Sequence, residues 1–320
     1  MPIFEKDKIV KPDGLDSEPV IGDAPPTIIE PGEGYVEADT GRLHYLDWGG
    51  SGRQIHLLHA AGFCAGIYSP FVKYLLNDFH TIASDIRGHG GSEIIDIRRI
   101  RHWETFADDL NSLIGQTMTP PVIGVGHSLG AVATFMAAAI YPNLFSGIIL
   151  IEPVILPGHI LWLLGALRML GLSKKIPLVK QARRRRKIFQ GKKEALKLFT
   201  SGRGIFKTWS REFVDAYLEC GLLEKNPETA VLTCDPELEA QIYESIPTNI
   251  WKYAKKISCP VLAIRGRQSD IFYPESAERL GNLIVDLELK TIPAAGHFVP
   301  MEKPKECSEI IKDFVHRKIL

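Results

Sequence analysis

Apolar and polar positions alternate along this chain in blocks of two kinds. Six apolar runs have the length of strands: residues 55–59, 80–84, 121–125, 148–151, 261–265 and 287–292. Helical spacing follows at residues 102–114 and 129–141, between the last two runs, and from residue 305 onward. Strands that alternate with helices are typical of parallel sheets covered by helices. The pattern therefore predicts an α/β fold with a mostly parallel sheet and helices on both faces.

The first part of the chain has a different pattern. Residues 1–34 contain six prolines and show neither helical nor strand periodicity, so we expect an N-terminal extension there. Residues 35–48 form two runs around a turn near 39–41, which predicts a β-hairpin.

The alternation also stops between about residues 153 and 251. Helical patterns appear at 160–170, 179–189, 194–200 and 211–222, and we find no strand pattern among them. We therefore predict a core made of residues 35–152 and 252–320, with an inserted all-helical cap, or lid, at 153–251. Residues 160–167 are apolar, and we interpret them as the buried face of a cap helix rather than as a lipid contact.

The strongest chemical signal is Gly-His-Ser-Leu-Gly at residues 126–130. It directly follows a predicted strand and directly precedes a predicted helix. A serine on such a tight turn needs glycines on either side, and the turn lifts its hydroxyl above the sheet. The helix that follows adds backbone N–H groups and a dipole that favour a developing oxyanion. This context predicts that Ser128 is a nucleophile.

A serine nucleophile needs a base, and the base needs an orienting acid. In enzymes with this turn the order along the chain is serine, acid, histidine. Asp270 and His297 each follow a late strand, and loops at the carboxyl ends of parallel strands open on one side of a sheet. We predict His297 as the base and Asp270 as the acid. Glu152, at the end of the run 148–151, is the rival acid.

Two further groups of residues complete the predicted site. The oxyanion hole takes one N–H from Leu129 and one from the loop after an early strand, which we assign to Ala61. Phe63, Tyr68 and Phe298 flank these motifs and are candidates for the substrate pocket, although core packing explains them equally well.

Composition narrows the choice of partners. Lys+Arg and Asp+Glu number 38 each, which gives no reason to expect nucleic acid, and we interpret the basic run 183–187 as a solvated face. Five cysteines without a close pair disfavour disulfides and structural zinc and suit a reducing compartment, the cytoplasm. We expect no secretory signal, and Pro157, glycines and Arg168 interrupt the longest apolar stretch, so we expect no stable membrane insertion.

Five segments resemble the α/β-hydrolase family: residues 59–62, 85–92, 126–130, 260–270 and 295–297. The resemblance implies an eight-stranded, mostly parallel sheet, acyl transfer to water and no cofactor or metal. It also implies the roles given above for Ser128, Asp270 and His297, and for Leu129 and Ala61 as oxyanion donors. The chain departs from the family at Ala60, where a glycine is usual.

Family members with a serine nucleophile and a helical cap are mostly carboxylesterases. We therefore expect a hydrolase of small-molecule carboxylic esters that acts through an acyl-enzyme. Hydrolysis of a lactone, a thioester or a carbon–carbon bond remains open, as does a barely catalytic ligand receptor. The natural substrate and the oligomeric state are not fixed by the sequence.

Overall fold

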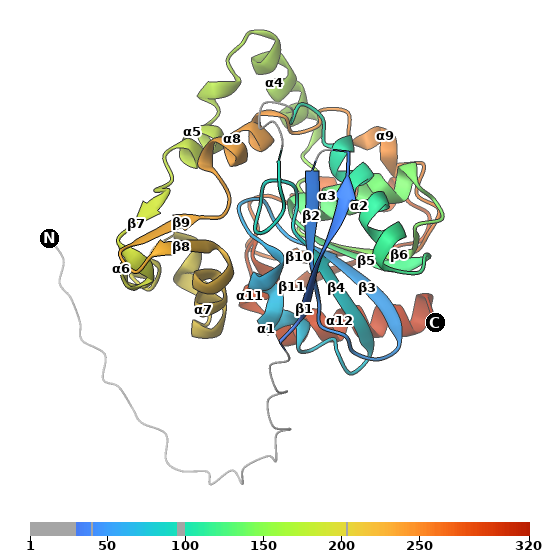
Figure 1. The fold of residues 1–320 in the computed structure, drawn as a ribbon. Coiled ribbons are helices and arrows are strands. Elements are labelled where there is room, and N and C mark those ends of the chain that lie inside the picture. Colours follow the sequence, from blue (N-terminus) through green and yellow to red (C-terminus); the bar gives the residue numbers. More distant parts are fainter. Residues whose placement is uncertain (1–29, 40, 95–99, 203) are drawn as a thin grey trace, which may run out of the picture.

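The structure is a computed structural model that describes residues 30–39, 41–94, 100–202 and 204–320. Its centre is an eight-stranded sheet in which β1 and β2 are antiparallel and the six remaining strands run parallel to one another (Figure 1). In spatial order the strands are β1 (Gly32–Ala38), β2 (Gly41–Asp47), β4 (Phe79–Ser84), β3 (Arg53–Leu58), β5 (Val122–His127), β6 (Phe145–Ile151), β10 (Val261–Gly266) and β11 (Leu287–Ile292). The predicted α/β fold with a mostly parallel sheet is confirmed, as is the hairpin.

Helices cover both faces of the sheet, and a separate apolar core fills the space on each side. One core includes residues of α2 (Glu104–Thr117), α3 (Leu129–Ile140), α9 (Trp251–Ala254) and α10 (Pro274–Leu283). The other includes residues of the 3-10 helix η1 (Ala65–Tyr68), α1 (Ser69–Val72), α11 (Val299–Glu302) and α12 (Pro304–Lys318). Helix α3 is buried almost throughout because its residues are small or apolar, so it can pack closely on β5 and β6.

Residues 153–250, which we call the insertion, connect β6 to α9 (Figure 1). Their helices are α4 (Gly158–Met169), η3 (Ser173–Lys175), α5 (Pro177–Arg183), α6 (Gly191–Phe199), η4 (Gly204–Thr208), α7 (Arg211–Cys220) and α8 (Pro236–Glu244). Their strands are β7 (Ile188–Phe189), β8 (Leu222–Asn226) and β9 (Thr229–Leu232).

The prediction of an all-helical cap is therefore wrong. The insertion carries a small antiparallel sheet in the order β7-β9-β8, and the helix expected at 179–189 ends at Arg183. Only two residues form β7, and β8 exposes four of its five residues, so neither strand carries the apolar alternation by which strands are recognised. At the other end, β1 begins at Gly32, inside the predicted extension, and residues 1–29 lie outside the described part of the chain.

Candidate active site

Ser128 occupies the tight turn between β5 and α3. Its φ of 57° and ψ of −114° are rare for a residue with a side chain. A Cβ atom at Gly126 would lie 2.4 Å from the carbonyl oxygen of Gly130, and one at Gly130 would lie 2.2 Å from that of Leu58. Close approach of the backbone therefore requires glycine at both positions, as the Gly-His-Ser-Leu-Gly motif predicts.

The imidazole of His297 reaches Ser128 from the loop after β11. Its Nε2 atom lies 2.9 Å from Oγ of Ser128, so the hydroxyl can donate to the ring. This loop passes directly over the end of β10, where a Cβ atom at Gly266 would lie 2.2 Å from the carbonyl oxygen of Gly296. The structure therefore brings the predicted nucleophile and base together.

The acid beside His297 is Glu152, and the prediction of Asp270 requires correction. Oε2 of Glu152 lies 3.1 Å from Nδ1 of His297, and Glu152 is fully buried at the end of β6. Asp270 is exposed. The turn after β10 brings Ser269 inward instead, where its hydroxyl donates to Glu152 and its oxygen accepts the amides of Ile271 and Phe272.

Three donors surround the carboxylate of Glu152. The amide of Gly266 donates to Oε1 at 2.6 Å, and the Ser269 hydroxyl and Nδ1–H of His297 donate to Oε2. The φ of Glu152 is 50°, and its own amide donates to the carbonyl of Ile264 in the neighbouring strand. A buried charge is tolerated only when it is paired and hydrogen-bonded, and Glu152 meets that condition.

A second chain of buried hydrogen bonds connects the loop that carries His297 with the loop after β3. Nε2–H of His127 donates to the carbonyl oxygen of His297 at 2.8 Å, so its Nδ1 is left to accept from the hydroxyl of Tyr68 at 2.6 Å. The Tyr68 oxygen in turn accepts the amide of Ala60 at 3.1 Å. Burial lowers the pKa of His127 to about 3, so the ring is neutral at physiological pH. Tyr68, expected as a pocket residue, is fully buried in this chain.

In the loop after β3, the amides on either side of Ala61 already have acceptors. The amide of Ala60 is used by Tyr68, and that of Gly62 donates to Nε2 of His89 at 3.1 Å. Burial lowers the pKa of His89 to about 3, which keeps this nitrogen an acceptor. Among the described residues no acceptor faces the amide of Ala61. Leu129 is the first residue of α3, where helix amides have no partner within the helix.

Aromatic rings from the core and the insertion meet beside His297. Phe298 packs edge-on against His297 with centroids 5.2 Å apart, and Phe63 stacks on Phe298 at 5.8 Å. Trp209 of the insertion contacts Phe63 at 5.5 Å and Phe298 at 5.7 Å. Tyr217 of α7 adds a further edge contact to Phe63. Phe63 and Phe298 therefore form an apolar cluster beside His297, and the insertion packs against this cluster.

The insertion also touches the loop after β3 through a charged pair. Arg185 donates to the carboxylate of Glu239 and, at 2.8 Å, to the hydroxyl of Tyr217. A Cβ atom at Gly62 would lie 2.7 Å from Nη1 of Arg185 and 2.9 Å from Oε1 of Glu239. The neighbouring Glu239 and Tyr217 oppose the effect of burial and hold the pKa of Arg185 above its usual value. The Arg185–Glu239 pair therefore brings no net charge to the loop after β3.

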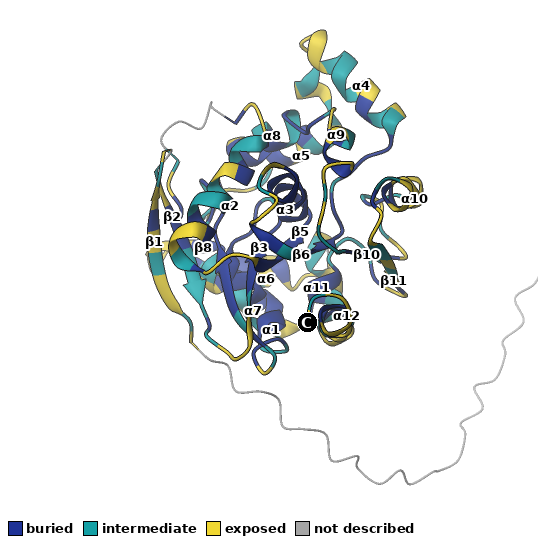
Figure 2. Cartoon of the chain, turned by 90° about the vertical axis from the view of Figure 1, so that its right-hand side faces the viewer, coloured by how far each residue is buried: buried dark blue, intermediate teal, exposed yellow. Residues whose placement is uncertain are grey.

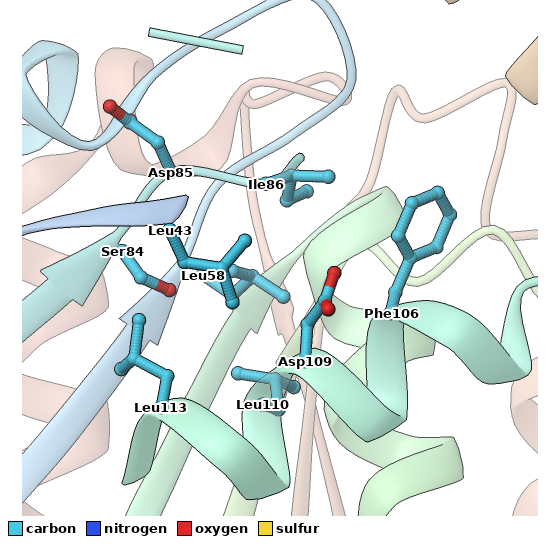
Figure 3. A pocket seen from close by; sticks show the side chains of 9 residues that line it. All are labelled: Leu43, Leu58, Ser84, Asp85, Ile86, Phe106, Asp109, Leu110 and Leu113. Carbon is cyan, nitrogen blue, oxygen red and sulfur yellow. The ribbon is translucent and has the colours of Figure 1, made fainter. Parts of the chain in front are cut away.

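The turn after β4 is structural. The carboxylate of Asp85 accepts the amides of Ala65 and Gly91, and it lies 2.7 Å from Nδ1 of His44. Beyond it, Arg87 forms two 2.6 Å bonds with Asp109. Figure 3 shows the small cavity below this turn, about 10 Å³ and lined mainly by aliphatic side chains. It is too small for a substrate.

A serine–histidine–glutamate chain thus lies above the carboxyl ends of the parallel strands of this α/β fold. The protein belongs to the alpha/beta hydrolase family, because the sequence model of that family matches residues 57–310.

Individual relatives are more distant. The 2-(acetamidomethylene)succinate hydrolase of Mesorhizobium japonicum is 25% identical over 266 residues, which are 83% of this chain and 89% of that protein. A crystal structure of E-2-(acetamidomethylene)succinate hydrolase superposes with a TM-score of 0.74 at 23% identity, covering 89% of this chain and 99% of that one. The structure of an esterase of M. tuberculosis superposes with a TM-score of 0.66 at 18% identity, covering 90% of this chain and 92% of that one. The protein is therefore a member of a hydrolase family with esterases among its structural neighbours.

Proposed function

We propose that this protein is a serine hydrolase that cleaves carboxylic esters through an acyl-enzyme, with Ser128 as nucleophile, His297 as base and Glu152 as orienting acid. The observation that carries the proposal is the unbroken chain from the Ser128 hydroxyl through both ring nitrogens of His297 to a buried carboxylate. This is the arrangement that activates a serine at neutral pH.

The mechanism follows from these contacts. Oγ of Ser128 attacks the ester carbonyl while Nε2 of His297 takes its proton, and the carboxylate of Glu152 stabilises the imidazolium that forms. The amides of Leu129 and Ala61 stabilise the negative charge on the carbonyl oxygen. His297 then returns its proton to the leaving alcohol. A water activated by the same ring hydrolyses the acyl-enzyme and regenerates Ser128.

The neighbourhood of Ser128 favours a neutral ester with an apolar group. Phe298 is partly buried beside His297, and Phe63 and Trp209 are buried against it, so aromatic side chains form this side of the site. The relative from Mesorhizobium japonicum is named for a succinate derivative, so a carboxylate-bearing substrate is the alternative. Arg185 lies against the loop after β3, but Glu239 neutralises its charge. The site therefore supports the neutral ester better.

We assign the insertion the role of a cap. Its Trp209 and its Arg185–Glu239 pair lie against Phe63 and Gly62, which border the amide of Ala61. A cap in this position excludes water from the acyl-enzyme and sets the size of the acyl group.

The test is a serine-directed fluorophosphonate probe combined with p-nitrophenyl esters of graded acyl length. We expect the probe to label Ser128, and Ser128→Ala to lose the label and at least about a thousandfold in kcat/KM while keeping its circular dichroism spectrum. Labelling of Ser128 without turnover of any ester would contradict ester hydrolysis and favour a lactone, a thioester, a carbon–carbon bond or a receptor function. Turnover by Ser128→Ala near the wild-type rate would contradict the assignment of Ser128 as the nucleophile.

A further inference from the structure

Helix α4 is apolar but scarcely buried. Of its 12 residues only Leu161 is buried, and Figure 2 shows the helix projecting from the body of the protein. Large apolar side chains are exposed on it and on the residue that follows: Trp162, Leu163, Met169 and Leu170. Trp162 is 75% exposed and Met169 is 87% exposed. One face of the segment, formed by Ile160, Leu161 and Leu164, packs against the core as we expected, whereas Trp162 and Leu163 face away from it.

A broad hollow of about 900 Å³ continues this apolar surface between α4 and α9. Its lining includes Trp162 and Met169 from α4, and Trp251 and Lys252 from α9. The guanidinium of Arg279 lies 4.2 Å from the ring centre of Trp251. The surface thus combines an apolar floor with cations at its rim, and exposed apolar surface rimmed by polar residues is typical of interaction sites.

The charge of this part of the chain is one-sided. Residues 153–193 contain 11 lysines and arginines and no aspartate or glutamate. The whole chain has 38 basic and 38 acidic residues, so the remainder is acidic by the same margin of 11. The segment that carries α4 is therefore basic, and the rest of the chain is acidic.

The basic residues divide into two groups. Arg183, Arg185, Arg186 and Lys187 pair with carboxylates of α6, of α8 and of the residue before α8. A second group is exposed and has no carboxylate within 4 Å among the described residues: Arg168, Lys174, Lys175, Lys180 and Arg184. Lys174 and Lys175 belong to η3, directly after α4, so unpaired charge and exposed apolar surface adjoin.

We propose that α4 and the unpaired cations beside it dock this protein on an anionic phospholipid bilayer. Trp162, Leu163 and Met169 enter the boundary between headgroups and acyl chains, and Lys174 and Lys175 contact lipid phosphates. An apolar helix with flanking lysines and a tryptophan has the composition of such interfacial elements. The role goes beyond ester hydrolysis and does not depend on it.

Charge complementarity selects the bilayer over a second copy of this chain. A symmetric dimer through α4 would bring the two unpaired basic groups together, which repels, whereas an anionic bilayer attracts both. The helix lies on the surface and does not cross it, because 12 residues span about 18 Å and the apolar core of a bilayer is about 30 Å thick. Within the described part of the chain, no helix combines the length and the apolar character that crossing would need.

The test is sedimentation of the full chain with vesicles. We expect mixed phosphatidylcholine–phosphatidylglycerol vesicles to bind it at least about tenfold more tightly than phosphatidylcholine alone, with weaker binding at high salt. Trp162→Ser/Met169→Ser and, separately, Lys174→Glu/Lys175→Glu should each weaken binding to mixed vesicles about tenfold. Matched changes on the acidic remainder of the surface, Val285→Ser/Leu289→Ser and Lys303→Glu/Lys305→Glu, should leave it unchanged.

Two results separate this surface from the active site and from self-association. Ser128→Ala should bind vesicles as the unmodified protein does, so a failure of ester hydrolysis leaves the docking test intact. The proposal is overturned if mixed vesicles do not bind the protein or if neither α4-region variant weakens binding. It is also overturned if size-exclusion chromatography shows a dimer that Trp162→Ser/Met169→Ser dissociates while vesicles do not bind.

Discussion

At the residue scale, the carboxylate of Glu152 controls the orientation of His297. The acid is fully buried, and its oxygens accept from Gly266, Ser269 and His297. With Nδ1–H donating to Glu152, Nε2 carries the lone pair that the Ser128 hydroxyl needs. A change that keeps the shape of Glu152 but removes its charge therefore tests its role directly.

We expect Glu152→Gln to lower kcat about 10²- to 10⁴-fold with a small change in KM, because the amide cannot stabilise the imidazolium and can impose the wrong tautomer. The measurement is steady-state turnover of a short p-nitrophenyl ester. Asp270→Asn is the matched control, and its activity should stay within about twofold of wild type because this carboxylate is exposed. Loss of activity in Asp270→Asn with normal activity in Glu152→Gln would return the orienting role to Asp270.

The site was predictable where local sequence determines geometry. Ser128 lies between glycines whose Cβ atoms would collide with backbone, and this requirement is visible in the motif itself. The acid was not predictable in this way, because Glu152 and Asp270 both follow strands. Which of them turns inward depends on the positive φ of Glu152 and on the turn that brings Ser269 to Glu152, and neither is encoded in an apolar pattern.

At the scale of elements, the contact between α3 and β3 links the nucleophile to the loop after β3. A Cβ atom at Gly130 would lie 2.2 Å from the carbonyl oxygen of Leu58 and 2.6 Å from that of His59. Backbone atoms on both sides cannot yield as a flexible side chain would. The N-terminus of the helix is therefore fixed against the end of the strand.

We expect Gly130→Ala to lower the free energy of unfolding by about 1–3 kcal/mol or more, as in other overpacked cores, and to reduce activity because α3 must shift. Denaturant unfolding and ester turnover measure the two effects. Gly115→Ala is the control: Gly115 lies in α2 with open space around its Cβ position. The free energy of unfolding of that variant should rise by about 0.5–1 kcal/mol, because alanine has a higher helix propensity than glycine. Equal stability of both variants would contradict the close contact.

The core elements were predicted well and those of the insertion less well. Strands such as β5 and β6 are continuous apolar runs because both faces of the sheet are covered. Strand β8 is mostly exposed and β9 is only four residues long, so the apolar signal of this hairpin is weak. Its Asn226-Pro227 dipeptide is a turn signal that could have located it.

At the scale of the whole molecule, buried histidines link stability to pH. Burial lowers the pKa of His56, His89 and His127 to about 3. An unfolded histidine titrates near 6.5. Between these values the unfolded chain binds protons that the folded chain does not, so the free energy of unfolding falls as the pH falls through this window.

We expect each of these histidines to contribute up to about 1.4 kcal/mol per pH unit to that fall. The measurement is denaturant unfolding at a series of pH values below 6.5. His56→Asn removes one such group within β3, where its ring lies against Ser84, and should reduce the slope by about one proton, whatever its effect on absolute stability. His159→Asn, at an exposed position on α4, should leave the slope unchanged. An identical slope in His56→Asn would contradict the assignment.

The hydrogen bonds from Ala60 through Tyr68 and His127 to His297 have a mechanical consequence. They connect the loop after β3, to which we assign an oxyanion donor, with the loop that carries His297, our proposed base. His127 in this chain is neutral at physiological pH, so we expect the connection to persist when His297 takes up a proton. We therefore expect substrate to be admitted by movement of the insertion rather than of these two loops.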